Sequence, residues 1–146
     1  MTHAVPRPRE RGQALVETAI TLPAIFLLLF GFLAVLIRIE AQVELDTATS
    51  LALASCVSAR ENSPDCYNWA EATYDSTMHQ YSYIQVKPGS LHCPGNGTHA
   101  YTWGESVTCS AEATLLYRNT PMAYLVLTDV TITSTATTTA PSYRSQ

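Results

Sequence analysis

The feature that most constrains this chain is a long apolar run from Ala14 to Ile37. Only four of its residues are neither aliphatic, aromatic nor glycine, namely Glu17, Thr18, Thr21 and Pro23. Because a helix rises about 1.5 Å per residue, residues 13–37 would form one about 37 Å long, enough to cross a hydrocarbon core of about 30 Å. The run therefore predicts one transmembrane helix over residues 13–37, with a lipid bilayer around it.

Pro23 is expected to kink this helix about three turns from its start, because proline has no amide hydrogen to donate to the preceding turn. Neighbouring helices, or the hydroxyls of Thr18 and Thr21, could partly compensate the backbone group that is left without a partner. The prediction is therefore a kinked span that remains helical on both sides of Pro23.

The formal net charge of −4 is unevenly distributed along the chain. Residues 1–12 carry three arginines and one glutamate, so this segment has a charge of +2 and the remainder has −6. Short Arg-rich flanks stay on the cytoplasmic side of a membrane. We therefore expect residues 1–12, which also contain two prolines, to be an unstructured cytoplasmic leader, and everything after the span to be extracytoplasmic. The acidic exported part gives no support for nucleic-acid binding.

All four cysteines follow the apolar run, at Cys56, Cys66, Cys93 and Cys109. An extracytoplasmic location is oxidising, so two disulfide bonds are expected there. Of the three pairings that four cysteines allow, bonds between Cys56 and Cys66 and between Cys93 and Cys109 are favoured, because each closes a short loop between neighbouring elements. A zinc site is the alternative, but no C-x-x-C or H-x-x-x-H spacing is present.

The helical pattern continues beyond the span, since apolar residues recur among polar ones with no glycine or proline before Pro64. The sequence predicts a helical stalk over residues 38–59, followed by an extracytoplasmic head over residues 60–146. Ser63 and Pro64 are typical of a helix start, and the tyrosines and alanine that follow recur every three or four residues, which predicts a second helix over 64–79.

After that helix, side chains alternate with period two, which is typical of half-buried strands. The clearest alternation runs from Val107 to Tyr117, and a second runs from Val130 to Thr137. Two more strands are expected near Tyr81 to Val86 and His99 to Trp103, separated by a loop that contains Pro88, Gly89, Pro94, Gly95 and Gly97. The predicted fold class is α+β: a long transmembrane helix that extends into a small head with a second helix and an antiparallel sheet.

Glu17 is the residue of the apolar run that most needs an explanation, because it places a carboxylate inside a membrane span. Near a helix centre an ionised carboxylate costs about 2.5 to 3.5 kcal/mol, and less near the interface. Cleavage after Gly12 would give Gln13 an α-amino group about one helical turn from Glu17 of the same or a neighbouring chain. The alternative is a plain signal anchor, in which Gly12 is linker and Glu17 lies at the interface.

The segment RGQALVETAITLPAIFLLLFGF resembles the N-terminal signature of TadE-like proteins, the pseudopilins of the tight-adherence (Flp-type) pilus, which are related to type IV prepilins. The resemblance covers about the first 45 residues and includes Gly12, Glu17 five residues later, and Leu22-Pro23. It implies cleavage between Gly12 and Gln13 by a prepilin peptidase, allows methylation of the Gln13 amine, and makes Glu17 the charge that registers one subunit against the next.

Thr18 stands where the major Flp pilins usually carry tyrosine and many TadE-like chains carry phenylalanine. Major Flp pilins are also much shorter. The sequence therefore favours a non-enzymatic minor pilin or pseudopilin that takes part in pilus assembly, with other pilin-like subunits as partners through its N-terminal helix. One alternative is a bitopic membrane protein whose disulfide-bonded ectodomain binds a surface ligand without joining a filament. Another, a secreted enzyme, would need signal cleavage near Ala52-Leu53-Ala54, far beyond the apolar run.

Candidates for chemistry in the predicted head are poor. Its histidines, with Cys93, lack metal-ligand spacing, so no metal or cofactor is expected; they are His79, His92 and His99. The aromatic residues could form a carbohydrate platform, although at helix and strand spacing half-buried core residues are the commoner interpretation; they are Tyr67, Trp69, Tyr74, Tyr81, Tyr83, Tyr101 and Trp103. Asn96-Gly97-Thr98 matches a glycosylation sequon, and no nucleophile motif is recognisable.

Overall fold

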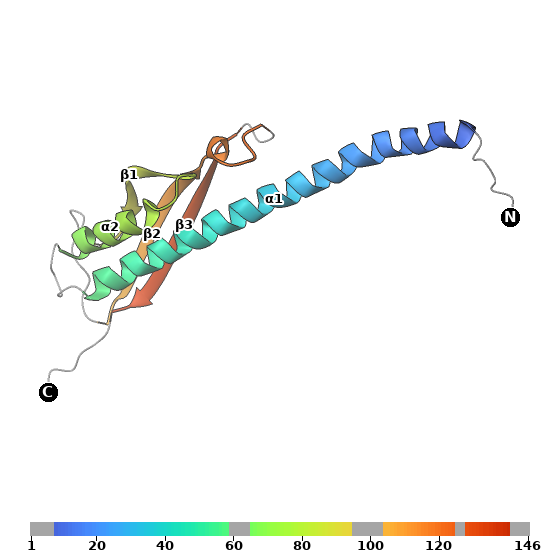
Figure 1. Ribbon diagram of the computed structural model, residues 1–146. Helices are drawn as coiled ribbons and strands as arrows, with labels where there is room; N and C mark the ends of the chain where they lie inside the picture. Colours follow the sequence, from blue (N-terminus) through green and yellow to red (C-terminus); the bar gives the residue numbers. More distant parts are fainter. Residues whose placement is uncertain (1–7, 59–64, 95–103, 125–127, 141–146) are drawn as a thin grey trace, which may run out of the picture. The chain divides into compact units, whose positions relative to one another are not determined.

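The computed structural model describes residues 8–58, 65–94, 104–124 and 128–140, with side chains from Leu15 onward in the first of these ranges. These residues form an α+β structure with a long N-terminal helix, a second helix and a three-stranded sheet (Figure 1). The chain divides into two compact units, Met1–Leu36 and Ile37–Gln146. The first unit contains the apolar part of helix α1, and the second contains the rest of α1 together with the described elements of the head.

Helix α1 runs from Pro8 to Ser58 and includes both the apolar segment and the predicted stalk. The expectation that all of residues 1–12 would be unstructured is wrong for residues 8–12, which are helical. Proline is well tolerated in the first turn of a helix, where its missing amide hydrogen has no partner to lose, and the residues that follow it include good helix formers. The C-terminal end at Ser58 agrees with the predicted end near residue 59.

Pro23 lies inside α1, and the helix continues through it. The carbonyl that proline leaves without a helical partner is that of Ala19, four residues earlier. The Thr21 hydroxyl does not take over this role, because it donates to the carbonyl of Glu17 at 2.8 Å and lies 3.5 Å from that of Thr18. Of the alternatives considered for this carbonyl, the Thr21 hydroxyl is therefore wrong.

The head contains helix α2 (Asp65–Met78), strands β1 (Ile84–His92), β2 (Ser106–Leu115) and β3 (Val130–Thr139), and a short 3-10 helix η1 (Tyr117–Asn119). The sheet order is β1-β2-β3, and both pairs are antiparallel. Strand β2 is central and alternates as predicted, with a buried row of Val107, Cys109, Ala111, Ala113 and Leu115. The predicted strand at residues 99–103 lies outside the described residues.

The core of the head lies between this buried face of the sheet and two helical stripes. Residues spaced three or four apart on the C-terminal part of α1 are buried: Ala41, Leu45, Ala48, Ala52 and Cys56. Helix α2 contributes a stripe with a strict spacing of four: Cys66, Ala70, Tyr74 and Met78. Both helices place one face against the core because their apolar residues recur at the helical period. These helices lie beside the sheet in Figure 1.

Strand β1 differs from the strand predicted near Tyr81 to Val86: it begins at Ile84 and continues to His92, so that Pro88 and Gly89 lie inside it and not in a loop. The register shifts between Val86, which pairs with Ala113, and Leu91, which pairs with Ala111. Over this stretch β1 advances by five residues while β2 advances by two. β1 is an edge strand, where a proline without an amide hydrogen and a glycine at φ 75° can both be accommodated in a bulge. The bulge therefore replaces the first part of the predicted loop, whereas Gly95 and Gly97 lie outside the described residues.

Two disulfide bonds join Cys56 to Cys66 and Cys93 to Cys109, which is the arrangement that short loops favour. The first links the end of α1 to the start of α2, across ten residues of sequence. The second links the residue that follows β1 to the middle of β2, across sixteen. Each bond therefore connects two neighbouring elements of the head.

Candidate functional site: the apolar helix and its carboxylate

The first part of α1 has apolar side chains exposed on every side. They include the four consecutive residues Ile25, Phe26, Leu27 and Leu28, which at about 100° per residue point to all sides of the helix. Burying a large aliphatic or aromatic side chain is worth about 1.5 to 3 kcal/mol, so this surface is stable only when lipid or other apolar chains cover it. By length and composition this part of α1 is a candidate membrane span.

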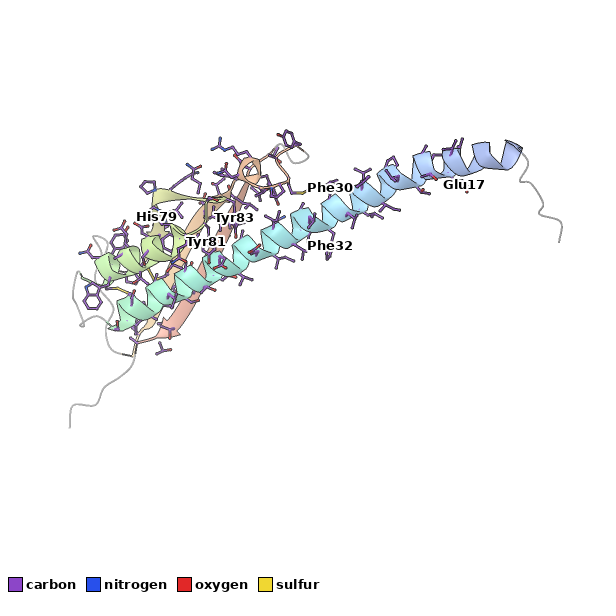
Figure 2. The ribbon with its side chains drawn as sticks, in the orientation of Figure 1. Glu17, Phe30, Phe32, His79, Tyr81 and Tyr83 are labelled. Carbon is purple, nitrogen blue, oxygen red and sulfur yellow. A yellow bond between two sulfur atoms is a disulfide. The ribbon has the colours of Figure 1, made fainter. Side chains whose placement is uncertain are left out.

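Glu17 lies on α1 among these apolar side chains, near the N-terminal end of the helix (Figure 2). Its side chain is exposed. Among the described residues, no hydrogen bond or ion pair to its carboxylate is found, although its backbone carbonyl accepts the hydroxyl of Thr21. The carboxylate is thus available to a partner from outside the described part of the chain.

Gly12 and Gln13 also lie within α1, four and five residues after its first residue. Gln13 precedes Glu17 by four residues, which is one helical turn, or about 6 Å along the axis. An amine created at Gln13 would therefore lie one turn from the carboxylate of its own chain. The same spacing allows a staggered neighbouring helix to present its amine to this carboxylate. The structure thus places the predicted cleavage point and Glu17 on one helix.

The four cysteines lie elsewhere, in the two disulfides of the head, so they form no common site with Glu17. Cys93 is bonded to Cys109 and is not available as a metal ligand. His79 and His92 are exposed, and His99 lies outside the described residues. The described part of the chain contains no group of three or more histidine, cysteine or acidic side chains placed to hold a metal ion.

The aromatic residues do not form one platform. Tyr74 is buried in the core, whereas Trp69 on the same helix is 56% exposed. Tyr101, Trp103 and the sequon at residues 96–98 lie outside the described residues. Tyr81 and Tyr83 do lie together, with ring centroids 5.9 Å apart in an edge-on arrangement. The expectation of half-buried aromatic residues holds for Tyr67, Tyr81 and Tyr83.

A cluster of two tyrosines and two glutamates, not predicted from the sequence, connects α1 to the head. The Tyr81 hydroxyl donates to Oε2 of Glu44 at 2.6 Å. This hydrogen bond, with smaller effects of burial and of neighbouring charges, raises the pKa of Tyr81 to about 12. Burial, followed by the charges of Glu40 and Glu44, raises the pKa of Tyr83. Glu40 and Glu44 share one helical face because they are four residues apart, which is the only sign of the cluster in the sequence.

A second polar contact joins α1 to the free edge of the sheet. The side-chain amide of Gln42 donates to the backbone carbonyl of Thr133 on β3 at 2.9 Å and to Oδ1 of Asp46 at 3.1 Å. Together with the Tyr81–Glu44 bond, it holds the part of α1 after Leu36 against the head.

Comparison with protein-family models, curated proteins and solved structures finds no match to this chain.

Proposed function

We propose that the chain is a membrane-anchored, non-enzymatic minor pilin or pseudopilin that takes part in assembly of a tight-adherence (Flp-type) pilus. The observation that carries the proposal is Glu17, the single carboxylate of the apolar run from Ala14 to Ile37, whose surface is exposed; it lies five residues after Gly12. A carboxylate in this position hinders insertion into a bilayer, so its presence is best explained by a use that follows insertion.

That use is pairing with an amine at the N-terminus of a neighbouring subunit. A prepilin peptidase would cut between Gly12 and Gln13, and the new positive charge would then meet Glu17 of the next helix. Where the dielectric constant is low, the two charges attract strongly when they are close, and either charge is costly when it is unpaired. The pair therefore favours the one stagger of adjacent helices that brings the amine to the carboxylate. The exposed apolar surface from Leu15 to Leu36 would supply the packing between subunits.

The proposed location follows from the same helix. Its apolar part spans the inner or cytoplasmic membrane before incorporation, with the Arg-rich leader inside and the head outside. Two disulfides in the head suit an oxidising compartment. The partners are the bilayer, the prepilin peptidase and other pilin-like subunits.

The proposal is tested by intact mass and N-terminal sequencing of the protein from envelopes of cells with and without prepilin peptidase. A mature chain that begins at Gln13 only when the peptidase is present supports the pilin. An uncut leader in both strains would contradict it and favour the bitopic ectodomain, which binds a surface ligand without joining a filament. A chain that begins at Ser55 would contradict it in favour of secretion.

A further inference from the structure

The head contains a cavity that the proposed pilin function does not use. It has a volume of about 200 Å³ and lies between α2 and the bulge of β1. A cavity of about 150 Å³ can hold a benzene ring, so this one has room for one six-membered ring with polar substituents. Figure 2 shows His79, which lines the cavity, just past the end of α2.

The bulge in β1 provides one wall of this cavity. Four residues between the register positions Val86 and Leu91 are not paired with β2, and all four line the cavity: Lys87, Pro88, Gly89 and Ser90. Gly89 has φ 75°, a conformation that a side chain would strain. Bulges of this kind are frequent next to binding and active sites, where they turn a side chain toward a ligand. Here the bulge brings Lys87 and Ser90 to the cavity.

Helix α2 provides the opposite wall with a row of polar residues. Glu71, Asp75 and His79 are four residues apart, and each comes one position after a member of the buried row Ala70, Tyr74 and Met78. A shift of one position turns the side chains by about 100°, from the core toward its margin. The amide of His79 donates to the carbonyl of Asp75 at 2.9 Å, which continues this row beyond the last residue of α2.

Two hydroxyl groups at the base of the cavity have no hydrogen-bond partner in the described structure. They belong to Tyr74, whose side chain is only 1% exposed, and to Ser90, and both oxygens are buried. Burial raises the pKa of Tyr74, and the nearby Ser90 hydroxyl opposes this rise, although the two groups do not reach hydrogen-bond geometry with each other. Buried polar groups are normally paired, so two together at one cavity indicate a missing polar partner.

The charges of the lining disfavour a simple anion, because the carboxylates of Glu71 and Asp75 outnumber the ammonium of Lys87. A small organic cation would be attracted to the same carboxylates, so the test below includes one as a probe. A metal ion would need three or more suitable side chains together, which the described residues do not provide. The lining offers carboxylates that accept hydrogen bonds, an ammonium that donates them and hydroxyls that do both. This combination matches a ligand whose own polar groups are hydroxyls. Val86, Pro88 and Leu91 add apolar contact for the C–H face of a ring.

We propose that the cavity between α2 and the β1 bulge binds one neutral sugar ring, such as a terminal residue of a surface glycan. Asp75 and Glu71 accept hydrogen bonds from its hydroxyls, Lys87 donates to a ring or hydroxyl oxygen, and the Tyr74 hydroxyl donates from below. The cavity belongs to the unit Ile37–Gln146, whereas Glu17 belongs to the unit Met1–Leu36, so the two sites can be changed separately.

The test is saturation-transfer NMR on the full-length chain in a zwitterionic detergent without sugar headgroups. The probes are the methyl glycosides of glucose, galactose, mannose, rhamnose and N-acetylglucosamine, each at about 10 mM because one ring binds weakly. At least one glycoside should give a signal. A lost hydrogen bond to a charged group should weaken this binding about tenfold or more in Asp75→Asn. Tyr74→Phe should also weaken it, while keeping the shape of the core.

The matched control is Glu112→Gln, the same kind of change on the exposed face of β2, which should leave the signal unchanged. Circular dichroism of each variant separates lost binding from lost folding. The proposal is overturned if no glycoside gives a signal, or if Asp75→Asn and the control give equal signals. It is also overturned if only ethanolamine, added as an ammonium probe, binds.

Discussion

At the scale of single residues, the hydrogen bond between Tyr81 and Glu44 makes the attachment of the head to α1 sensitive to high pH. The pKa of Tyr81 is about 12 in the folded protein and about 10 in an unfolded chain. A raised tyrosine pKa means that the folded state favours the protonated phenol. Its contribution to stability is therefore complete below about pH 10 and is lost as the pH rises toward about 12.

We therefore expect the denaturant midpoint of the head to fall between about pH 10 and 12, and to fall less in Tyr81→Phe, which has no phenol at this position to ionise. The midpoints would be measured by chemical denaturation of parent and variant at several pH values. Tyr124→Phe is the control, because this tyrosine is 94% exposed. An equal loss of stability in the parent and in Tyr81→Phe would contradict the assigned role of the bond.

Gly12 is the second residue with a specific expectation. A peptidase at the membrane surface must reach the backbone, and glycine offers it without a side chain. Gly12→Ala should be cleaved poorly and Gly12→Lys not at all, whereas the neighbouring change Arg11→Lys should be cleaved normally. The measurement is the shift of the protein on a gel, by about twelve residues of leader. A normally shortened Gly12→Lys protein would refute this requirement.

At the scale of secondary-structure elements, the best predicted parts are those whose pattern is set by local spacing. Helix α1 follows from an apolar run with no strong break except Pro23, and β2 follows from strict alternation between buried and exposed residues. The bulge of β1 could not be predicted, because Pro88 and Gly89 carry the same local signal in a loop and in an edge strand. Only the pairing with β2 distinguishes the two, and that pairing is not local.

The same reasoning separates the two candidate sites. Gly12 and Glu17 are close in sequence, so helical spacing alone predicts their relation. The cavity combines Asp75 on α2 with Lys87 on β1, and the contact between α1 and the head combines Glu44 with Tyr81. Sequence spacing carries no information on these pairs, because tertiary packing brings them together.

We expect the small head to need its two disulfides for stability. A domain of fewer than a hundred residues buries limited apolar surface, and a short-loop disulfide typically adds about 2 to 4 kcal/mol. Reduction should therefore lower the denaturant midpoint of the head, as should each paired change, Cys56→Ser with Cys66→Ser or Cys93→Ser with Cys109→Ser. Mass spectrometry that finds four free thiols in protein from the native envelope would rule out this role.

At the scale of the whole molecule, the two units of the chain carry separate tasks in this account. The unit Met1–Leu36 contains the candidate span, the leader and Glu17, whereas the unit Ile37–Gln146 contains the sheet, the disulfides and the cavity. Changes in the cavity should therefore alter ligand binding without altering assembly. Changes at Glu17 should alter assembly without altering the head.

The most direct test of the central claim compares Glu17→Ala with the parent in cells that express the other pilus components. Alanine removes the carboxylate, so insertion and leader cleavage should remain nearly intact, while the Gln13 amine of a neighbouring subunit loses its partner in a surrounding of low dielectric constant. Thr18→Ala is the matched control. The account predicts parental amounts of Glu17→Ala in the membrane fraction and little or none in sheared filaments, and equal recovery in filaments would contradict it.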